Sequence, residues 1–305
     1  MYDTIIIGGG PCGMTAAIYL RRANKSVLML EKFSVGGQMA ITMGIENYPG
    51  EIKIDGDVLS SKMFDQCNAL GVETKFEEVV SCDLEGQVKI VRTHKNTYEG
   101  KTVLICTGAS ARPLNLANEK SFLGKGLSYC ATCDGNFYKN KDVAVVGGGN
   151  TSFADCLYLS GLANKVYLVH RREEFRGDAL TLSKIQQLKD NGKIEFVLNS
   201  VVDEICGNQT LDGIVVKNLV NGKKTKLDIS GLFVAIGRKP DTEFLKDSVS
   251  LGDDGYIITD DTMQTNISGV YAGGDARNTP FRQIVTACGD GATASVGILK
   301  YLSQN

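Results

Sequence analysis

The sequence predicts an α/β fold of two domains, each built around a β-turn-α-β unit. A chain of 305 residues is long enough for two such domains. An apolar strand at residues 4–7 leads into a glycine-rich turn, and another at residues 141–146 leads into a second one. Glycine is abundant, at 35 residues against 5 prolines, which suits close backbone approach to a ligand better than disorder.

Charge and cysteine usage exclude several classes of protein. The 33 basic and 35 acidic residues nearly balance, which argues against a broad nucleic-acid-binding surface. No apolar run reaches the roughly 20 residues that cross a bilayer, and the chain enters a strand pattern at once, so neither a membrane span nor a signal peptide is expected. The nine cysteines are scattered apart from one close pair, which is typical of a cytoplasmic protein and not of a secreted disulfide framework.

The first glycine-rich turn has the spacing of a dinucleotide-binding site. Gly8, Gly10 and Gly13 form a G-x-G-x-x-G pattern between the strand and a helical stretch. Gly8 allows the tight turn, Gly10 lets the backbone approach a pyrophosphate, and Gly13 lets the helix pack on the strand. The pyrophosphate would lie at the helix N-terminus. Glu31 ends the next strand, where it would accept hydrogen bonds from ribose hydroxyls.

Between the two glycine-rich turns, the pattern indicates one helix, short strands and loops. An amphipathic helix is expected over residues 57–70, and strands are expected over 72–76, 79–83, 87–93 and 102–106. The segments Gly36–Gln38 and Asn47–Gly50 read as loops by themselves. The last strand runs into Thr107-Gly108, where the backbone either approaches a cofactor or simply turns, since this dipeptide is common.

The second unit repeats the first and ends differently. Gly147–Ser152 follows the strand, a helix is expected over 153–161, and the next strand covers 165–170. Instead of an acid, this strand is followed by a basic run that contains Arg171, Arg172 and Arg176. Arginine binds a phosphate in bidentate fashion, and an acid would repel it. The second unit therefore predicts a site for NADP(H), with its 2′-phosphate on the arginines.

The remaining elements are strands at 194–198, 212–217 and 228–236, then a strand near 269–272 and a C-terminal helix that begins near Arg282 and reaches Leu302. The strand near 269–272 closes on Gly273-Gly274-Asp275. An acid at the carboxyl end of a strand, before a helix, lies where a doubly wound sheet binds its ligand. Asp275 is a candidate for ligand contact, with helix capping as the alternative.

One cysteine pair, Cys130 and Cys133, has C-x-x-C spacing and is followed by Asp134. Zinc needs about four ligands, and there is no second C-x-x-C and only two histidines, so no metal site is expected. A c-type haem would need a histidine after Cys133. Two inert buried thiols remain an alternative. A redox disulfide is favoured, because one thiolate attacks a disulfide, its neighbour resolves the intermediate, and Asp134 exchanges the proton.

Together these motifs resemble those of the low-molecular-weight thioredoxin reductases, which are flavoprotein disulfide reductases with two dinucleotide-binding domains. The resemblance covers essentially the whole chain. The C-A-T-C-D pentapeptide is its most discriminating part, because glutathione-reductase-type relatives carry their redox pair in the first domain. The matching segments are 8–13, 36–38, 46–50, 130–134, 147–152, 170–176, 273–275 and 282–283.

The resemblance implies two Rossmann-like domains, the second inserted into the first. Residues 1–113 and 246–305 would bind FAD, and residues 114–245 would bind NADPH. Thioredoxin would be the substrate of a homodimer, with Cys133 facing the flavin, Cys130 attacking the substrate and Asp134 as the acid and base. The implied FAD contacts are Gly8, Gly10, Pro11, Gly13, Glu31, Gly37, Gln38, Asn47, Thr107, Gly108, Gly274, Asp275, Arg282 and Gln283. The implied NADPH contacts are Gly149, Asn150, Thr151, Arg171, Arg172 and Arg176.

The sequence departs from the commoner family pattern at several positions without losing a catalytic group. Ser152, Cys12 and Cys106 stand where alanine is frequent, Asn136 replaces an apolar residue, and Gly274 extends A-G-D to A-G-G-D. An alternative function is a related flavin-dependent disulfide oxidoreductase that uses ferredoxin as donor or another protein as acceptor. A further alternative, of another class, is a non-catalytic flavin-binding sensor.

Overall fold

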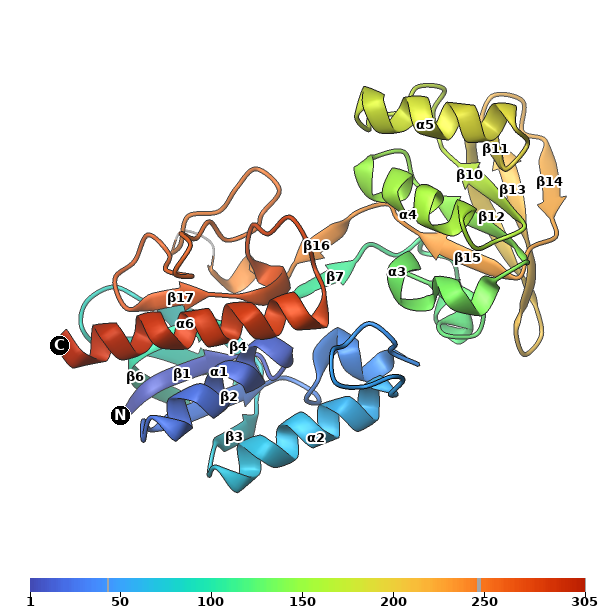
Figure 1. The fold of residues 1–305 in the computed structure, drawn as a ribbon. Coiled ribbons are helices and arrows are strands. Elements are labelled where there is room, and N and C mark those ends of the chain that lie inside the picture. The colour runs from blue at the N-terminus through green and yellow to red at the C-terminus, as the bar shows by residue number, and fades with distance from the viewer. Residues whose placement is uncertain (43, 246–247, 305) are drawn as a thin grey trace. The chain divides into compact units, whose positions relative to one another are not determined.

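The computed structural model describes residues 1–42, 44–245 and 248–304, which form two compact units. The first unit contains Met1–Ser110 and Lys239–Asn305, and the second contains Ala111–Arg238. The chain passes between them through two short strands, β7 (Ala109–Ala111) and β16 (Arg238–Pro240), which pair with each other (Figure 1). These compact units divide after Ser110 and Arg238. The assignment of residues 1–113 and 246–305 to FAD, and of residues 114–245 to NADPH, stays a prediction.

The first unit is a sheet with helices packed on one face. Its strands run in the order β3-β2-β1-β6-β5-β4, and β17 pairs with β6. They are β1 (Tyr2–Ile7), β2 (Val27–Glu31), β3 (Glu73–Phe76), β4 (Val79–Asp83), β5 (Lys89–Thr93), β6 (Thr97–Ile105) and β17 (Val270–Ala272). The helices are α1 (Pro11–Arg22), α2 (Gly56–Ala69) and α6 (Ile284–Gln304), with 3-10 turns η1 (Gly37–Ile41), η4 (Glu243–Leu245) and η5 (Gly274–Ala276).

Alternation along the central strand explains the two-sided core of this sheet. In β1, Ile6 packs in the cluster that contains the helices α1 and α6, which lie side by side in Figure 1. Its neighbours Ile5 and Ile7 pack on the opposite face, with residues such as Leu84 and Ile257. Since successive side chains of a strand point to opposite faces, a fully apolar strand predicts burial on both sides. The strand β1 is buried on both faces.

The second unit combines a parallel sheet with an antiparallel one. The parallel sheet has the order β11-β10-β9-β15-β8, and its strands are β8 (Leu127–Ser128), β9 (Asp142–Val146), β10 (Lys165–Val169), β11 (Ile194–Val197) and β15 (Gly231–Val234). The antiparallel sheet is β12 (Ser200–Gly207), β13 (Leu211–Asn218) and β14 (Lys224–Leu227). The helices are α3 (Ala131–Asp134), α4 (Asn150–Ser160) and α5 (Ala179–Asp190), with 3-10 turns η2 (Glu119–Phe122) and η3 (Gly135–Tyr138).

Several elements of the second unit were not expected from the sequence, among them β12, β14 and α5. The exposed strand β14 reads Lys-Thr-Lys-Leu and has no apolar face to identify it. In α5, the apolar residue Leu180 is 72% exposed, so the apolar residues of this helix do not all lie on its buried face. This helix is marked instead by its N-cap, since Asp178 accepts a hydrogen bond from the backbone N–H of Thr181 at 2.8 Å.

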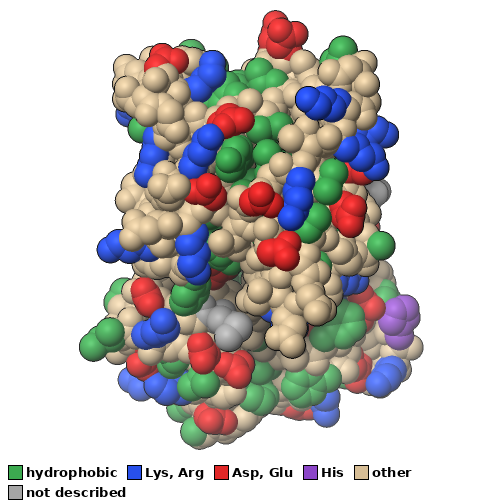
Figure 2. Space-filling model, turned by 90° about the vertical axis from the view of Figure 1, so that its right-hand side faces the viewer, with side chains coloured by type: hydrophobic (Ala, Val, Ile, Leu, Met, Phe, Trp, Pro, Cys, Tyr) green, Lys and Arg blue, Asp and Glu red, His purple; other side chains and the backbone are tan. Residues whose placement is uncertain are grey.

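Basic and acidic side chains are interspersed over the face of the molecule in Figure 2 and do not gather in one field of a single sign. This distribution accompanies a formal net charge of −2 at pH 7. Within residues 1–42, 44–245 and 248–304, no helix is both long enough and apolar enough to cross a membrane.

Candidate active site

Cys130 and Cys133 are joined by a disulfide, with their Cα atoms 5.3 Å apart. Cys130 lies before the single-turn helix α3, and Cys133 lies within it. The turn brings the two sulfur atoms together, because residues three apart on a helical turn are neighbours. Both cysteines are half-buried, so the pair is neither sealed in the core nor fully open to solvent. The prediction that these two residues form a disulfide is confirmed.

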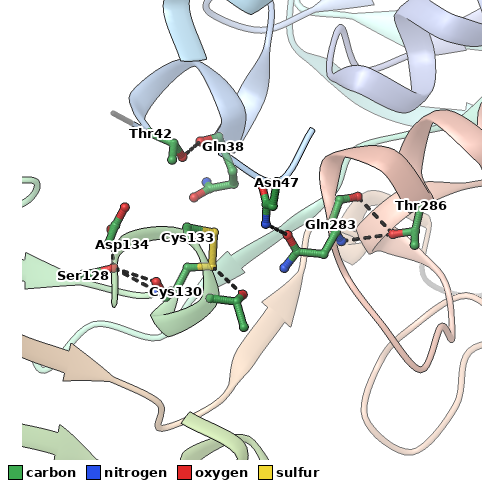
Figure 3. Close-up of a disulfide and its surroundings, with 10 residues drawn as sticks. Gln38, Thr42, Asn47, Ser128, Cys130, Cys133, Asp134, Gln283 and Thr286 are labelled. Carbon is green, nitrogen blue, oxygen red and sulfur yellow. Dashed lines mark hydrogen bonds between the residues drawn. A yellow bond between two sulfur atoms is a disulfide. The ribbon is translucent and has the colours of Figure 1, made fainter. Parts of the chain in front are cut away.

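The hydroxyl of Ser128 connects Cys130 to the carboxylate of Asp134 (Figure 3). It accepts a hydrogen bond from the backbone N–H of Cys130 at 3.0 Å. Its own hydrogen has two possible acceptors, Asp134 Oδ2 at 2.5 Å and the Cys130 carbonyl at 3.3 Å. Since a hydroxyl has one hydrogen, it donates to the nearer carboxylate. Ser128 thereby fixes the side chain of Asp134 on the same short turn as the disulfide.

Burial raises the pKa of Asp134 above its usual value, and the hydrogen bond from Ser128 opposes the rise. A carboxyl group in such a setting holds its proton more readily than one in water. It is therefore suited to receive a proton during thiol–disulfide exchange and to return it. The nearby Asp134 charge also contributes, after burial, to a pKa of Tyr138 of about 12, so that the phenol stays neutral.

Replacement of Asp134 by asparagine is expected to stabilise the fold while slowing turnover. A carboxyl whose pKa is raised by folding contributes stability that is present in acid and is lost as pH rises through the raised pKa. The melting temperature of Asp134→Asn should therefore exceed that of the parent at pH 8, and the gain should shrink as pH falls toward about 4. Turnover should fall about 10²-fold or more, because the proton acceptor is gone. Thermal melts at several pH values and steady-state rates measure both effects.

Ser128→Ala is the matched control for this prediction. It leaves the carboxyl in place but removes the hydrogen bond that favours its charged form, so the melting temperature at pH 8 should fall instead of rising. A stability gain of Asp134→Asn that is the same at pH 8 and at about pH 4 would contradict the assignment of a raised pKa.

The second glycine-rich turn is shaped by close contacts at two glycines and is open at the third. A Cβ atom on Gly147 would lie 2.5 Å from the carbonyl oxygen of Ala235, and one on Gly148 would lie 2.2 Å from the ring of His170. A Cβ on Gly149 would meet nothing within 4 Å. Gly149 is the N-cap of α4, so its open side adjoins the N-terminus of an 11-residue helix. This is the geometry in which backbone N–H groups receive a phosphate.

The arginine run lies on a loop that is tied to this turn. The backbone N–H of Arg176 donates to the carbonyl of Gly148 at 2.8 Å. The buried ring of His170 stacks on Phe175 with the centroids 5.1 Å apart, and burial lowers the His170 pKa. The positive charge of the loop therefore comes from Arg171, Arg172 and Arg176. All three are exposed, and their side chains make no hydrogen bond or ion pair within the part of the chain that the structure describes.

The first glycine-rich turn has the same construction. A Cβ on Gly8 would lie 2.3 Å from the carbonyl oxygen of Cys106, and one on Gly13 would lie 2.0 Å from the carbonyl oxygen of Gly8. Gly10 has open space where its Cβ would be, and it precedes Pro11 at the start of α1. Proline suits this first helical position because the N–H that it lacks has no partner within the helix.

Glu31 and Thr107 line a cavity of about 420 Å³ in the first unit, next to Gly8. The carboxylate of Glu31 accepts hydrogen bonds from the backbone N–H groups of Gly9 at 2.8 Å and Phe33 at 3.0 Å. Each carboxylate oxygen has two acceptor sites, so capacity for a ligand hydroxyl remains. The cavity lies at the carboxyl ends of β1 and β2, where parallel sheets bind their ligands.

Other predicted FAD contacts lie just before α6, in η5 and in η1. Asn47 Nδ2 donates to Gln283 Oε1 at 3.0 Å, which joins two segments 236 residues apart (Figure 3). The guanidinium of Arg282 lies over the ring of Tyr256, 4.0 Å from its centroid. Asp275 lies in η5, immediately after β17. Gly37 and Gln38 lie in η1, whose preceding residue donates its N–H to the carbonyl of Gly9 at 2.8 Å.

Two buried polar atoms test whether this first unit fits a bound cofactor. Thr107 Oγ1 and Arg282 Nε are buried and have no hydrogen-bond partner among the described residues. Buried polar groups in proteins are nearly always paired, so such atoms point to a polar ligand. Both residues were predicted to contact FAD. The space above Gly10 supports the same conclusion, and the residues present fit FAD in the first unit.

Two residues that hold this machinery in place were not predicted from the sequence. Ser128 orients Asp134, as described above. Asp290, on α6, accepts a hydrogen bond from the N–H of Gly274 at 3.0 Å and pairs with Arg277 at 3.3 Å. These contacts anchor the turn that carries Asp275. Neither residue belongs to a recognisable motif, because each contact depends on how distant segments pack.

Comparisons with known proteins agree over the full chain. The thioredoxin reductase of Peptoclostridium acidaminophilum is 41% identical over 312 residues, covering 100% of this chain and 98% of the relative. That of Bacillus subtilis is 38% identical, covering 100% and 96%. The crystal structure of thioredoxin reductase from Streptococcus pyogenes has a TM-score of 0.94 at 42% identity, covering 100% and 99%.

These matches confirm the predicted α/β class with two Rossmann-like domains. The family described as pyridine nucleotide-disulphide oxidoreductase matches residues 2–291, which span both glycine-rich turns and the cysteine pair. The chain belongs to the pyridine nucleotide-disulphide oxidoreductase family.

Proposed function

We propose that this chain is an NADPH-dependent thioredoxin reductase that uses FAD and the Cys130–Cys133 pair. The observation that carries the proposal is the disulfide on the short turn of α3, in the same unit as the second nucleotide turn and followed by a carboxyl with a raised pKa. Relatives named thioredoxin reductase match over the whole length and support it. The exposed arginine loop favours NADPH over ferredoxin as the donor.

The reaction moves two electrons from NADPH to a protein disulfide. Bound FAD supplies the chemistry that turns a hydride from NADPH into reduction of a disulfide. NADPH, a proton and oxidised thioredoxin become NADP⁺ and the thioredoxin dithiol, so atoms and electrons balance. This chain contributes the dithiol, the proton carrier and the two nucleotide-binding turns.

Each residue of the C-A-T-C-D segment has a proposed task. The thiolate of Cys130 attacks the thioredoxin disulfide and forms a mixed disulfide, and the thiolate of Cys133 then attacks Cys130 Sγ and releases reduced thioredoxin. Asp134 accepts a proton from a thiol and gives it to the departing thiolate. The hydrogen bond from Ser128 keeps the Asp134 carboxyl in one orientation during both transfers.

We assign the first unit to FAD and the second to NADPH. In the first unit, the turn from Gly8 to Gly13 would hold the pyrophosphate and Glu31 the ribose, while Thr107, Asp275 and Arg282 would bind polar groups elsewhere on FAD. In the second, the N-terminus of α4 would hold the pyrophosphate of NADPH and the arginine loop its 2′-phosphate. A homodimer is part of the proposal, supported by the resemblance of the sequence to the family. A cytoplasmic location is part of it too, supported by the scattered cysteines.

Rapid mixing tests the proposal directly. NADPH should bleach the absorbance of the flavin in the holoenzyme, and oxidised thioredoxin should then restore it, with one thioredoxin disulfide reduced per NADPH consumed. A flavin that NADPH does not bleach would rule out the proposed donor. A flavin that is bleached but is not reoxidised by any member of a thioredoxin panel would rule out the proposed acceptor.

A further inference from the structure

A second pair of cysteines lies in the first unit, apart from the active-site disulfide. The sulfur atoms of Cys12 and Cys106 are 3.1 Å apart, and both residues are free thiols. They are buried, with exposures of 4% and 7%. A disulfide bond is about 2.05 Å long, so an approach of about 1 Å would join the two sulfurs.

The structure leaves space for this sulfur pair at a specific glycine. A Cβ on Gly273 would lie 2.6 Å from Cys12 Sγ. The backbone of Gly273 is extended, with φ −150° and ψ 168°, a conformation that any residue adopts. Glycine at this position is therefore explained by the room that the Cys12 thiol occupies and not by backbone conformation.

The two cysteines lie on elements that are already fastened together. Cys12 is in the first turn of α1, directly after the proposed pyrophosphate-binding backbone. Cys106 follows β6, and its N–H donates to the carbonyl of Ile7 at 2.8 Å, next to Gly8. Small shifts of two side chains would thus suffice to link the nucleotide-binding turn to the end of the neighbouring strand.

We propose that Cys12 and Cys106 are a second oxidisable dithiol, which forms a disulfide beneath the first nucleotide-binding turn when the protein meets a peroxide. The two thiols lose two protons and two electrons, and an S–S bond forms between their sulfur atoms. The O–O bond of hydrogen peroxide breaks, and its two oxygen atoms take up these protons and electrons to become two water molecules. The product ties the start of α1 to the end of β6.

The chemistry of this pair differs from that of the active site. The hydrogen bond between Cys12 and Cys106, followed by burial, raises the pKa of the Cys12 thiol well above its usual range. The reactive thiolate is therefore scarce, and oxidation is slow compared with that of an exposed active-site thiol. A disulfide that forms slowly and is buried is suited to stabilise the fold for a long time under oxidative stress. It is not suited to react in each catalytic cycle.

The test uses the FAD-loaded double variant Cys130→Ser/Cys133→Ser, from which the active-site pair has been removed. After treatment with hydrogen peroxide and alkylation under denaturing conditions, peptide mapping should find the Cys12 peptide linked to the Cys106 peptide. Two of the seven other cysteines should escape alkylation. Because the link closes a long loop, the melting temperature should rise by roughly 5 °C on oxidation and return after reduction.

Three matched variants separate this link from general oxidation. Cys12→Ala in the same background should lose both the linked peptide and the rise in melting temperature, and Cys106→Ala should do the same if the first variant folds poorly. Cys156→Ala removes a buried cysteine of the second unit and should change neither result. Recovery of Cys12 and Cys106 as alkylated thiols, or as sulfinic acids without the linked peptide, would overturn the proposal.

Discussion

Replacement of Cys133 by serine is expected to lower the rate of thioredoxin reduction by on the order of 10³-fold or more, while FAD binding and the fold are retained. Serine preserves the shape of the side chain but cannot form a disulfide or serve as a thiolate nucleophile at neutral pH. Cys133 is half-buried on the short turn of α3, so the exchange leaves no large cavity. Steady-state reduction of thioredoxin by NADPH measures the loss.

The roles of the two active-site cysteines can be distinguished by which serine variant accumulates a mixed disulfide with thioredoxin. If Cys130 attacks the substrate, Cys133→Ser should accumulate a mixed disulfide between Cys130 and thioredoxin, because the resolving thiol is absent. Cys130→Ser should form much less of it. Cys206→Ser, which removes a half-buried free cysteine of the second unit, should behave as the parent protein. Trapping by Cys130→Ser and not by Cys133→Ser would reverse the assigned roles.

The features that sequence patterns predict here are those with a fixed local spacing. The helix α1 begins at Pro11, directly after Gly10 and within the glycine pattern. A Cβ would clash at Gly8 and Gly13, and Gly10 leaves open space. The disulfide follows from the C-x-x-C spacing, because one helical turn suffices to bring Cys130 and Cys133 together. In each case, the residues that define the feature are neighbours along the chain.

The features that sequence patterns did not predict depend on packing between distant segments. Asp290 reaches the turn at Gly274 only because α6 packs against it. Cys12 and Cys106 are 94 residues apart, and their approach depends on the pairing of β1 with β6. Ser128 is close in sequence to Asp134, but its hydroxyl meets the carboxylate only through the specific turn between them. Contacts of this kind leave no periodic pattern in the amino-acid sequence.

The second large effect is expected from the arginine loop. The double variant Arg171→Ala/Arg176→Ala should raise the KM for NADPH by about 10²- to 10⁴-fold, because each charge-assisted hydrogen bond to a phosphate contributes about 1.5–3 kcal/mol. The KM for NADH should change little, since NADH lacks the 2′-phosphate. The backbone of Arg176 is held against Gly148, so its guanidinium extends from a point fixed beside the nucleotide turn.

Lys184→Ala is the matched control, because Lys184 is an exposed cation on the neighbouring helix α5. It should leave the KM for both nucleotides unchanged and so exclude a general effect of lost positive charge. The parent protein should also lose part of its preference for NADPH as salt increases, since exposed charges are screened over about 10 Å at 0.1 M ionic strength. Equal increases in KM for NADPH and NADH in the double variant would show that the arginines bind a part common to both nucleotides, and the 2′-phosphate assignment would then be wrong.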